Sequence, residues 1–161
     1  MIRPARPEDV PHILAFWNPV IRDTVVTFNS EEKTEEGLRE TIAAKEREGH
    51  GFLVAEDRGV LGFASYGQFR AGSGYARAME HTIILSPEAR GKGVGRALMA
   101  AIEDHARARG HHMMVAAVSG GNPAGVAFHA ALGYRETGRM PEAGWKFGQY
   151  WELVLMQKLL S

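Results

Sequence analysis

A glycine-rich turn with three basic side chains, at residues 90–96, is the stretch of this sequence best suited to binding an anion. Residues without a Cβ allow backbone N–H groups to point into one concavity, and the helical pattern that follows adds the positive end of a helix dipole. Basic side chains strengthen such contacts. The residues expected to hold a phosphate or pyrophosphate are Arg90, Gly91, Lys92, Gly93, Val94, Gly95 and Arg96.

Two other phosphate-binding loops do not fit this turn. A P-loop requires Lys-Ser or Lys-Thr after its last glycine, and neither dipeptide follows here. A dinucleotide-binding fingerprint requires a third glycine at position 96, which is Arg96, and it belongs in an early strand–helix unit. The remaining alternative is a glycine-rich connection with solvated charges.

Glu80 is a carboxylate inside an apolar run, residues 78–85, that ends just before the turn. In a strand, alternation places Glu80, Thr82 and Ile84 on one face and Met79, His81, Ile83 and Leu85 on the other. A carboxylate in such a run is costly unless it is paired or functional. A structural ion pair and an exposed edge position are therefore the alternatives to a chemical role.

The hydrophobic periodicity predicts a mixed α/β domain around these residues. Strands are expected at 2–5, 52–57, 60–70, 78–85, 112–120, 134–140 and 146–160. Helices are expected within 6–24, 34–51, 93–110 and 122–134. Pro19 is expected to bend or end the first helix, and Asn122 to cap the last one. The order β-α-α-β-β-β-α-β-α-β-β predicts a mixed sheet with helices on both faces.

The composition limits the class of protein. With 19 basic and 19 acidic residues the net charge is zero, which argues against a nucleic-acid partner. The absence of Cys excludes disulfides and a Cys nucleophile. Without a signal peptide or a long apolar run, we expect one domain over residues 1–161, a cytoplasmic location and no membrane partner. We expect no metal, because adjacent His111 and His112 would point to opposite faces of a strand.

The run Arg90-Gly-Lys-Gly93-Val-Gly95 resembles the acetyl-CoA signature R/Q-x-x-G-x-G/A of the GCN5-related N-acetyltransferases. The order of elements and the helix 122–134 are also similar to that superfamily, so the resemblance covers nearly the whole chain. It implies the acyl-CoA N-acyltransferase fold, with a twisted, mostly antiparallel sheet of about seven strands. It also implies acetyl-CoA as co-substrate.

Within that superfamily, the chain resembles the phosphinothricin and methionine sulfoximine (or sulfone) acetyltransferases at residues 23–28, 69–87, 122–134 and 140–157. This resemblance implies acetyl transfer to the α-amine of a small amino-acid-like compound, by a protein that is commonly a homodimer. Gly72 is a departure, because typical phosphinothricin enzymes carry a second basic residue there. The departure favours the sulfoximine or sulfone branch.

The resemblance implies three catalytic residues. The family's general base matches Glu80, and an α-ammonium must lose a proton before it attacks a thioester carbonyl. His129 is implied to assist proton removal or to contact the substrate, although a lone helical His is more often structural. Tyr134 matches a tyrosine that protonates the departing thiolate, with core packing as the alternative.

The resemblance also implies the binding residues. The strand end, Ile83, Ile84 and Leu85, would bind the pantetheine arm through its backbone, with Asn122 beside it and the pyrophosphate on residues 91–96. Arg70 is expected to pair with the acceptor carboxylate, because a planar guanidinium matches it bidentately. The alternative for Arg70 is a solvated charge at a strand end. The other acceptor-site residues are Phe28, Phe69, Tyr75, His81 and Thr82.

Two other functions remain open at this point. A protein or peptide N-terminal acetyltransferase uses the same cofactor loop but needs an open groove, whereas residues 69–75 and 140–150 are placed to cover the acceptor site. A non-catalytic acetyl-CoA-binding sensor would not need the three candidate catalytic residues. The sequence favours an enzyme acting on a small molecule.

Overall fold

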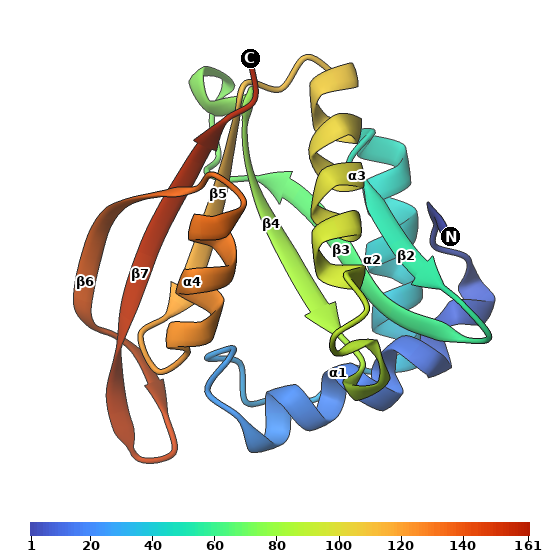
Figure 1. The fold of residues 1–161 in the computed structure, drawn as a ribbon, viewed down its shortest axis with the longest axis horizontal. Helices are drawn as coiled ribbons and strands as arrows, with labels where there is room; N and C mark the ends of the chain where they lie inside the picture. The colour runs from blue at the N-terminus through green and yellow to red at the C-terminus, as the bar shows by residue number, and fades with distance from the viewer.

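The structure is a computed structural model that describes all 161 residues. Its strands form one seven-stranded sheet in the order β1-β2-β3-β4-β5-β7-β6 (Figure 1). Neighbouring strands are antiparallel except for β4 and β5, which are parallel. The expected mixed, mostly antiparallel α/β fold is therefore confirmed. The strands are β1 Ile2–Pro4, β2 Phe52–Glu56, β3 Val60–Gln68, β4 Ala78–Leu85, β5 Met113–Ser119, β6 Arg135–Lys146 and β7 Gln149–Leu159.

Four α-helices cover the two faces of the sheet (Figure 1). They are α1 Val10–Asp23, α2 Glu35–Glu48, α3 Val94–Ala108 and α4 Pro123–Ala131. One core lies between the sheet and α1 and α2, around Ile13, Leu38 and Phe63. The other lies under α3 and α4, around Met79 and Ile102. None of the helices has both the length and the apolar character that a membrane-spanning segment needs.

Side-chain and glycine signals set the ends of α2 and α4. At the start of α2, Thr34 Oγ1 accepts a hydrogen bond from the backbone N–H of Gly37 at 3.0 Å. Gly49 ends that helix with a left-handed φ of 75°. Asn122 caps α4 as expected, because its Oδ1 accepts from the backbone N–H of Gly125 at 3.1 Å. The ends of both helices thus depend on residues that are close to them in the sequence.

The expectation that the first helix bends or ends at Pro19 is wrong as to its end. α1 continues through Pro19 to Asp23. A proline inside a helix removes one backbone donor, a cost that tertiary packing can offset. Ile21 is fully buried in the last turn, so packing maintains the helix beyond the proline.

The C-terminal hairpin also differs from the prediction. We expected the last strand to begin at Lys146, but β6 ends there and a two-residue turn follows. Phe147 and Gly148 both adopt left-handed φ angles, 54° and 73°, which match the twist of a tight hairpin turn. β6 also continues past its expected end at Met140: the register with β7 shifts between Met140 and Gly144, and the pairing then resumes as far as Lys146. The hairpin is therefore a long arm at the edge of the sheet (Figure 1).

Candidate active site

Strands β4 and β5 are paired at one end and separate toward the other (Figure 1). Their parallel pairing ends at Glu80↔Val115. Beyond this pair, β4 keeps only its antiparallel partner β3, as far as Leu85. The edge of β4 that faces β5 therefore has no strand partner from His81 to Leu85, and its backbone N–H and C=O groups can bind a ligand with amide groups.

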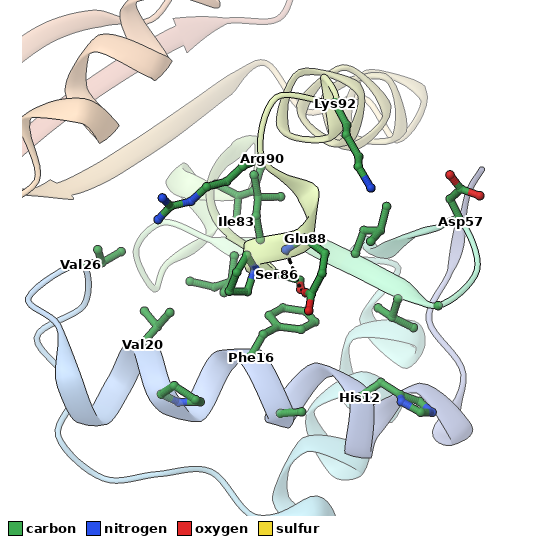
Figure 2. Close-up of a pocket in the computed structure, with 18 of the residues that line it drawn as sticks. His12, Phe16, Val20, Val26, Asp57, Ile83, Ser86, Glu88, Arg90 and Lys92 are labelled. Atoms are coloured by element: carbon green, nitrogen blue, oxygen red, sulfur yellow. Dashed lines mark hydrogen bonds between the residues drawn. The ribbon is translucent and has the colours of Figure 1, made fainter.

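A groove of about 1210 Å³ follows this end of β4 (Figure 2). Phe16 and Val20 of α1 point into the groove from one side, and Arg90 and Lys92 of the β4–α3 loop lie on the other. Residues 83–85 line it between them. The groove thus joins an apolar channel along a free strand edge to a basic loop, which suits a long ligand with an anionic segment.

The glycine-rich turn forms the N-terminus of α3. Gly91 and Gly93 adopt left-handed φ angles of 73° and 72°, and Gly93 is the N-cap residue without a side-chain cap. The first N–H groups of α3 are therefore available to an anion. Gly95 is buried, and a Cβ there would lie 3.2 Å from both Leu85 and Phe128. The turn has the backbone geometry that the sequence predicted for a phosphate site.

Glu80 lies where β4 leaves β5. Its side chain is half-buried on the α1 and α2 face of the sheet, the face that Ile84 also occupies. Burial raises the pKa of the Glu80 carboxyl, and no charged group offsets that effect. The structure therefore does not show the ion pair that was one alternative for this residue.

His81 and His129 form a buried pair across the gap between β4 and α4. Their Nε2 atoms lie 2.9 Å apart. His129 Nδ1 lies 2.7 Å from the Gly125 carbonyl oxygen and must donate to it, so in the neutral ring its Nε2 accepts from His81 Nε2–H. Burial lowers the pKa of both rings, that of His81 to about 3 with a further contribution from His129. Both ring nitrogens of His129 are thus occupied within the protein.

Tyr134 is buried beside this pair. Its hydroxyl donates to Glu103 Oε2 of α3 at 3.0 Å, and Lys158 of β7 binds the other oxygen of Glu103 at 2.7 Å. Burial, followed by the Glu103 charge, raises the pKa of the Tyr134 phenol. This contact supports the packing role that the sequence left open for Tyr134.

The predicted acceptor residues lie on three segments. Phe28, in the loop after α1, packs over Gly144 of the hairpin, where a Cβ would collide with its ring. Arg70 and Tyr75 lie in the β3–β4 loop, with the guanidinium 5.7 Å from the tyrosine ring. The remaining members are half-buried Phe69, exposed Thr82 on the Glu80 face, and His81, which is on the opposite face.

Sequence reasoning missed three residues near this site. Lys146 is buried and holds the loop after α1. Phe128 lies against the glycine-rich turn. Glu103 had a readable signal, because it is an acidic residue next to Ile102 on the apolar face of its helix. Lys146 had none, since its partners are backbone carbonyls far away in the sequence.

Comparison with known proteins agrees with this geometry. The profile of the acetyltransferase (GNAT) family matches residues 17–134. The chain belongs to this family. The L-methionine sulfoximine/L-methionine sulfone acetyltransferase of Pseudomonas paraeruginosa is 39% identical to it over 158 residues, which are 97% of this chain and 92% of the relative. The expected resemblance to the sulfoximine and phosphinothricin acetyltransferases is confirmed.

Solved GNAT structures share the whole fold. A GNAT superfamily phosphinothricin acetyltransferase from Sinorhizobium meliloti, in complex with AcCoA, superposes with a TM-score of 0.94 at 31% identity and covers 100% of this chain and 88% of that one. The ribosomal-protein-alanine N-acetyltransferase from Brucella melitensis superposes with a TM-score of 0.95 at 35% sequence identity, and the match covers 99% of each chain. The protein is an acetyl-CoA-dependent N-acetyltransferase, and the free β4 edge, the basic turn and the groove fit this donor.

Proposed function

We propose that the protein acetylates the α-amine of a small amino-acid-like acceptor of the methionine sulfoximine or sulfone type, with phosphinothricin as the weaker candidate. The activity of the Pseudomonas relative supports this acceptor class. The observation that carries the proposal is Glu80, a half-buried carboxylate without a cationic partner at the point where β4 leaves β5. Acetyl-CoA supplies the acetyl group as a thioester.

In the proposed reaction, Glu80 accepts a proton from the acceptor's α-ammonium, directly or through a water. The free amine nitrogen then bonds to the acetyl carbonyl carbon while the C–S bond breaks. A second proton of the amine goes to the departing sulfur, so CoA leaves as the thiol. The proton that Glu80 accepted is the one proton released overall. Burial raises the pKa of Glu80, which makes its ionised form a stronger base than an exposed carboxylate.

The donor side is built from backbone and basic groups. The free edge of β4 at residues 83–85 would bind the pantetheine amides, and the N–H groups at 91–96 would bind the pyrophosphate with Arg90 and Lys92 beside it. Asn122 uses its Oδ1 to cap α4, which leaves its amide N–H groups for the pantetheine arm. These groups orient the thioester toward Glu80.

The acceptor side is assigned to the loops around Glu80. Arg70, exposed beside Tyr75, would pair with the acceptor carboxylate. Gln68 fixes this loop by donating to the carbonyl oxygens of Arg70 and Gly72 at 2.7 and 2.8 Å. We assign His129 to positioning, because both of its ring nitrogens are occupied by His81 and the Gly125 carbonyl.

An acceptor panel tests the proposed function. CoA release is measured with methionine sulfoximine, methionine sulfone, phosphinothricin, common amino acids and an alanine-terminated peptide. The peptide is included because the similar structure from Brucella melitensis is named a ribosomal-protein-alanine N-acetyltransferase. We expect the highest kcat/KM with the sulfone or sulfoximine. Turnover with the peptide alone would contradict the proposal and indicate a protein N-terminal acetyltransferase. Tight acetyl-CoA binding without any turnover would indicate a non-catalytic sensor.

We also propose that the enzyme is a homodimer. Trp145, Phe147 and Tyr150 are each more than half exposed on the β6–β7 hairpin, and the Trp145 and Tyr150 rings pack at 4.8 Å. Exposed aromatic clusters of this kind are typical of protein interfaces. Sedimentation velocity is expected to give twice the mass of the chain, and a monomer at all concentrations would contradict the proposal.

A further inference from the structure

Lys146, at the end of β6, is a buried cation without a carboxylate partner. Its side chain is 3% exposed, and its Nζ donates to the carbonyl oxygens of Ile21 at 2.6 Å and Thr27 at 2.8 Å. Burial lowers the pKa of the ammonium group. Ile21 lies in the last turn of α1, where helix carbonyls lack intrahelical partners and favour a cation. Lys146 therefore binds the C-terminal end of α1 from the far end of the sequence.

Further contacts hold the same loop, residues 24–28, against the hairpin and the β5–α4 turn. Phe28 packs over Gly144, where a side chain would collide with the ring. Val25 Cγ1 lies 2.6 Å from the position of a Cβ on Gly121. Trp151 of β7 donates its Nε1–H to the Lys146 carbonyl oxygen at 2.8 Å, which fixes the backbone that carries the lysine. The loop is thus fixed on one side at three separate points.

The other side of this loop lines the groove. Thr24 and Val26 belong to the groove lining together with Ile83 of β4, and Figure 2 shows Val26 on the same side of the opening as Val20 of α1. The loop also carries Phe28, one of the predicted acceptor residues. The position of loop 24–28 relative to β4 therefore depends on contacts that the β6–β7 hairpin makes with the side of the loop that faces away from the groove.

We propose that Lys146 is a positioning residue for the acceptor, which holds loop 24–28 at the correct distance from β4 through its two carbonyl contacts. This inference rests on the proposed function, since it assigns the loop to the acceptor side. Both hydrogen bonds of the Lys146 ammonium go to backbone carbonyls, so we expect it to act through the loop and not on a substrate. Its two hydrogen bonds go to the α1 end and to loop 24–28, not to the glycine-rich turn or the free edge of β4, so its loss should disturb the donor groove only through the wall that Thr24 and Val26 form.

The test compares Lys146→Met with Lys33→Met. Lys33 is in the same α1–α2 connection, and its ammonium lies over the Trp17 ring without holding a backbone carbonyl. The control therefore removes one positive charge but no loop contact. We expect Lys146→Met to raise the acceptor KM at least tenfold and the acetyl-CoA KM by much less, because Thr24 and Val26 form only one wall of the donor groove. Lys33→Met should leave both within twofold.

A second variant disturbs loop 24–28 through the Phe28–Gly144 contact and not through Lys146. Gly144→Ala displaces Phe28 sterically and keeps the lysine, so it should raise the acceptor KM selectively even if Lys146→Met folds poorly. Amide hydrogen exchange of residues 24–28 should accelerate in both variants. Equal changes in the two KM values, or an unchanged acceptor KM in both folded variants, would overturn the inference.

The exchange measurement separates the two proposals. If the wild type acetylates none of the acceptors in the panel, the proposed function fails, but faster exchange confined to 24–28 in Lys146→Met would still support the loop contact. If the wild type is active and exchange at 24–28 does not change, the function stands and the role of Lys146 is refuted.

Discussion

At Glu80, burial and the lack of a cationic partner act in the same direction on the carboxyl group. Desolvation disfavours the charged form, so the pKa rises and the group becomes a stronger base. The neighbouring His81 points to the other face of β4 and is occupied by His129. The Nδ1 of His81 is buried without a hydrogen-bond partner, but the pKa of that ring is lowered to about 3, so we expect Glu80 rather than His81 to act as the base.

Replacing Glu80 by Gln removes the base and keeps the shape of the side chain. We expect kcat to fall by about 10²- to 10⁴-fold, the usual contribution of a general base. The wild-type kcat/KM should rise with pH as Glu80 deprotonates, at a pH above the usual range for a glutamate because burial raises its pKa. Steady-state kinetics from pH 5 to 9 checks both results. A variant with wild-type kcat would remove Glu80 from the mechanism.

Tyr134→Phe separates the two roles considered for that residue. The change deletes the hydroxyl that donates to Glu103 in a buried site, so the unfolding free energy should fall by about 1 to 3 kcal/mol. Turnover should stay within threefold of the wild type, because the phenol proton is held by a carboxylate. Urea denaturation and steady-state assays measure the two effects. A hundredfold loss of kcat in the folded variant would restore Tyr134 as the general acid.

At the scale of elements, the anion site depends on backbone conformation. Gly93 precedes α3 with φ 72°, a region in which a side chain costs about 1 to 3 kcal/mol. We expect Gly93→Ala to raise the acetyl-CoA KM severalfold and to leave the acceptor KM unchanged. Gly110→Ala is the matched control, because Gly110 has φ 82° at the other end of α3, far from the groove. Equal acetyl-CoA KM values in the two variants would contradict a role for this turn.

Local signals made most elements predictable, and long-range contacts account for the errors. The Asn122 cap and the alternation around Glu80 depend on neighbours in sequence, and both predictions are confirmed. The continuation of α1 past Pro19 depends on the burial of Ile21. Lys146 escaped notice because its carbonyl partners carry no side-chain signature. The glycine-rich turn and the strand before it could be predicted from local sequence, but the long-range contacts that hold loop 24–28 could not.

At the scale of the whole molecule, buried histidines connect stability to pH. Burial is the main cause of a lowered pKa at His50, His81, His105, His111 and His129. In the unfolded chain these rings take up protons below about pH 6.5, while the folded protein keeps them neutral to lower pH. The unfolded state therefore binds more protons, and the free energy of unfolding decreases as the pH falls below that value.

We expect the free energy of unfolding to fall between pH 7 and pH 5, with His81 alone contributing on the order of 2 kcal/mol because its pKa drops to about 3. Urea denaturation at pH 7, 6 and 5 measures the change. His81→Phe should flatten the pH dependence without changing its sign. Equal stability at pH 7 and pH 5 in the wild type would show that these rings are not buried as neutral groups.

We expect this fold to deliver an acetyl group to the α-amine of a small amino-acid analogue. The most direct measurement is the identification, by mass spectrometry and NMR, of the product that purified enzyme forms from acetyl-CoA and methionine sulfone. We expect stoichiometric α-N-acetylmethionine sulfone and free CoA from the wild type, and at most about 1% of that product from Glu80→Gln on the same timescale. Binding of acetyl-CoA without any acetylated sulfone or sulfoximine, or acetylation of a peptide N-terminus instead, would contradict it.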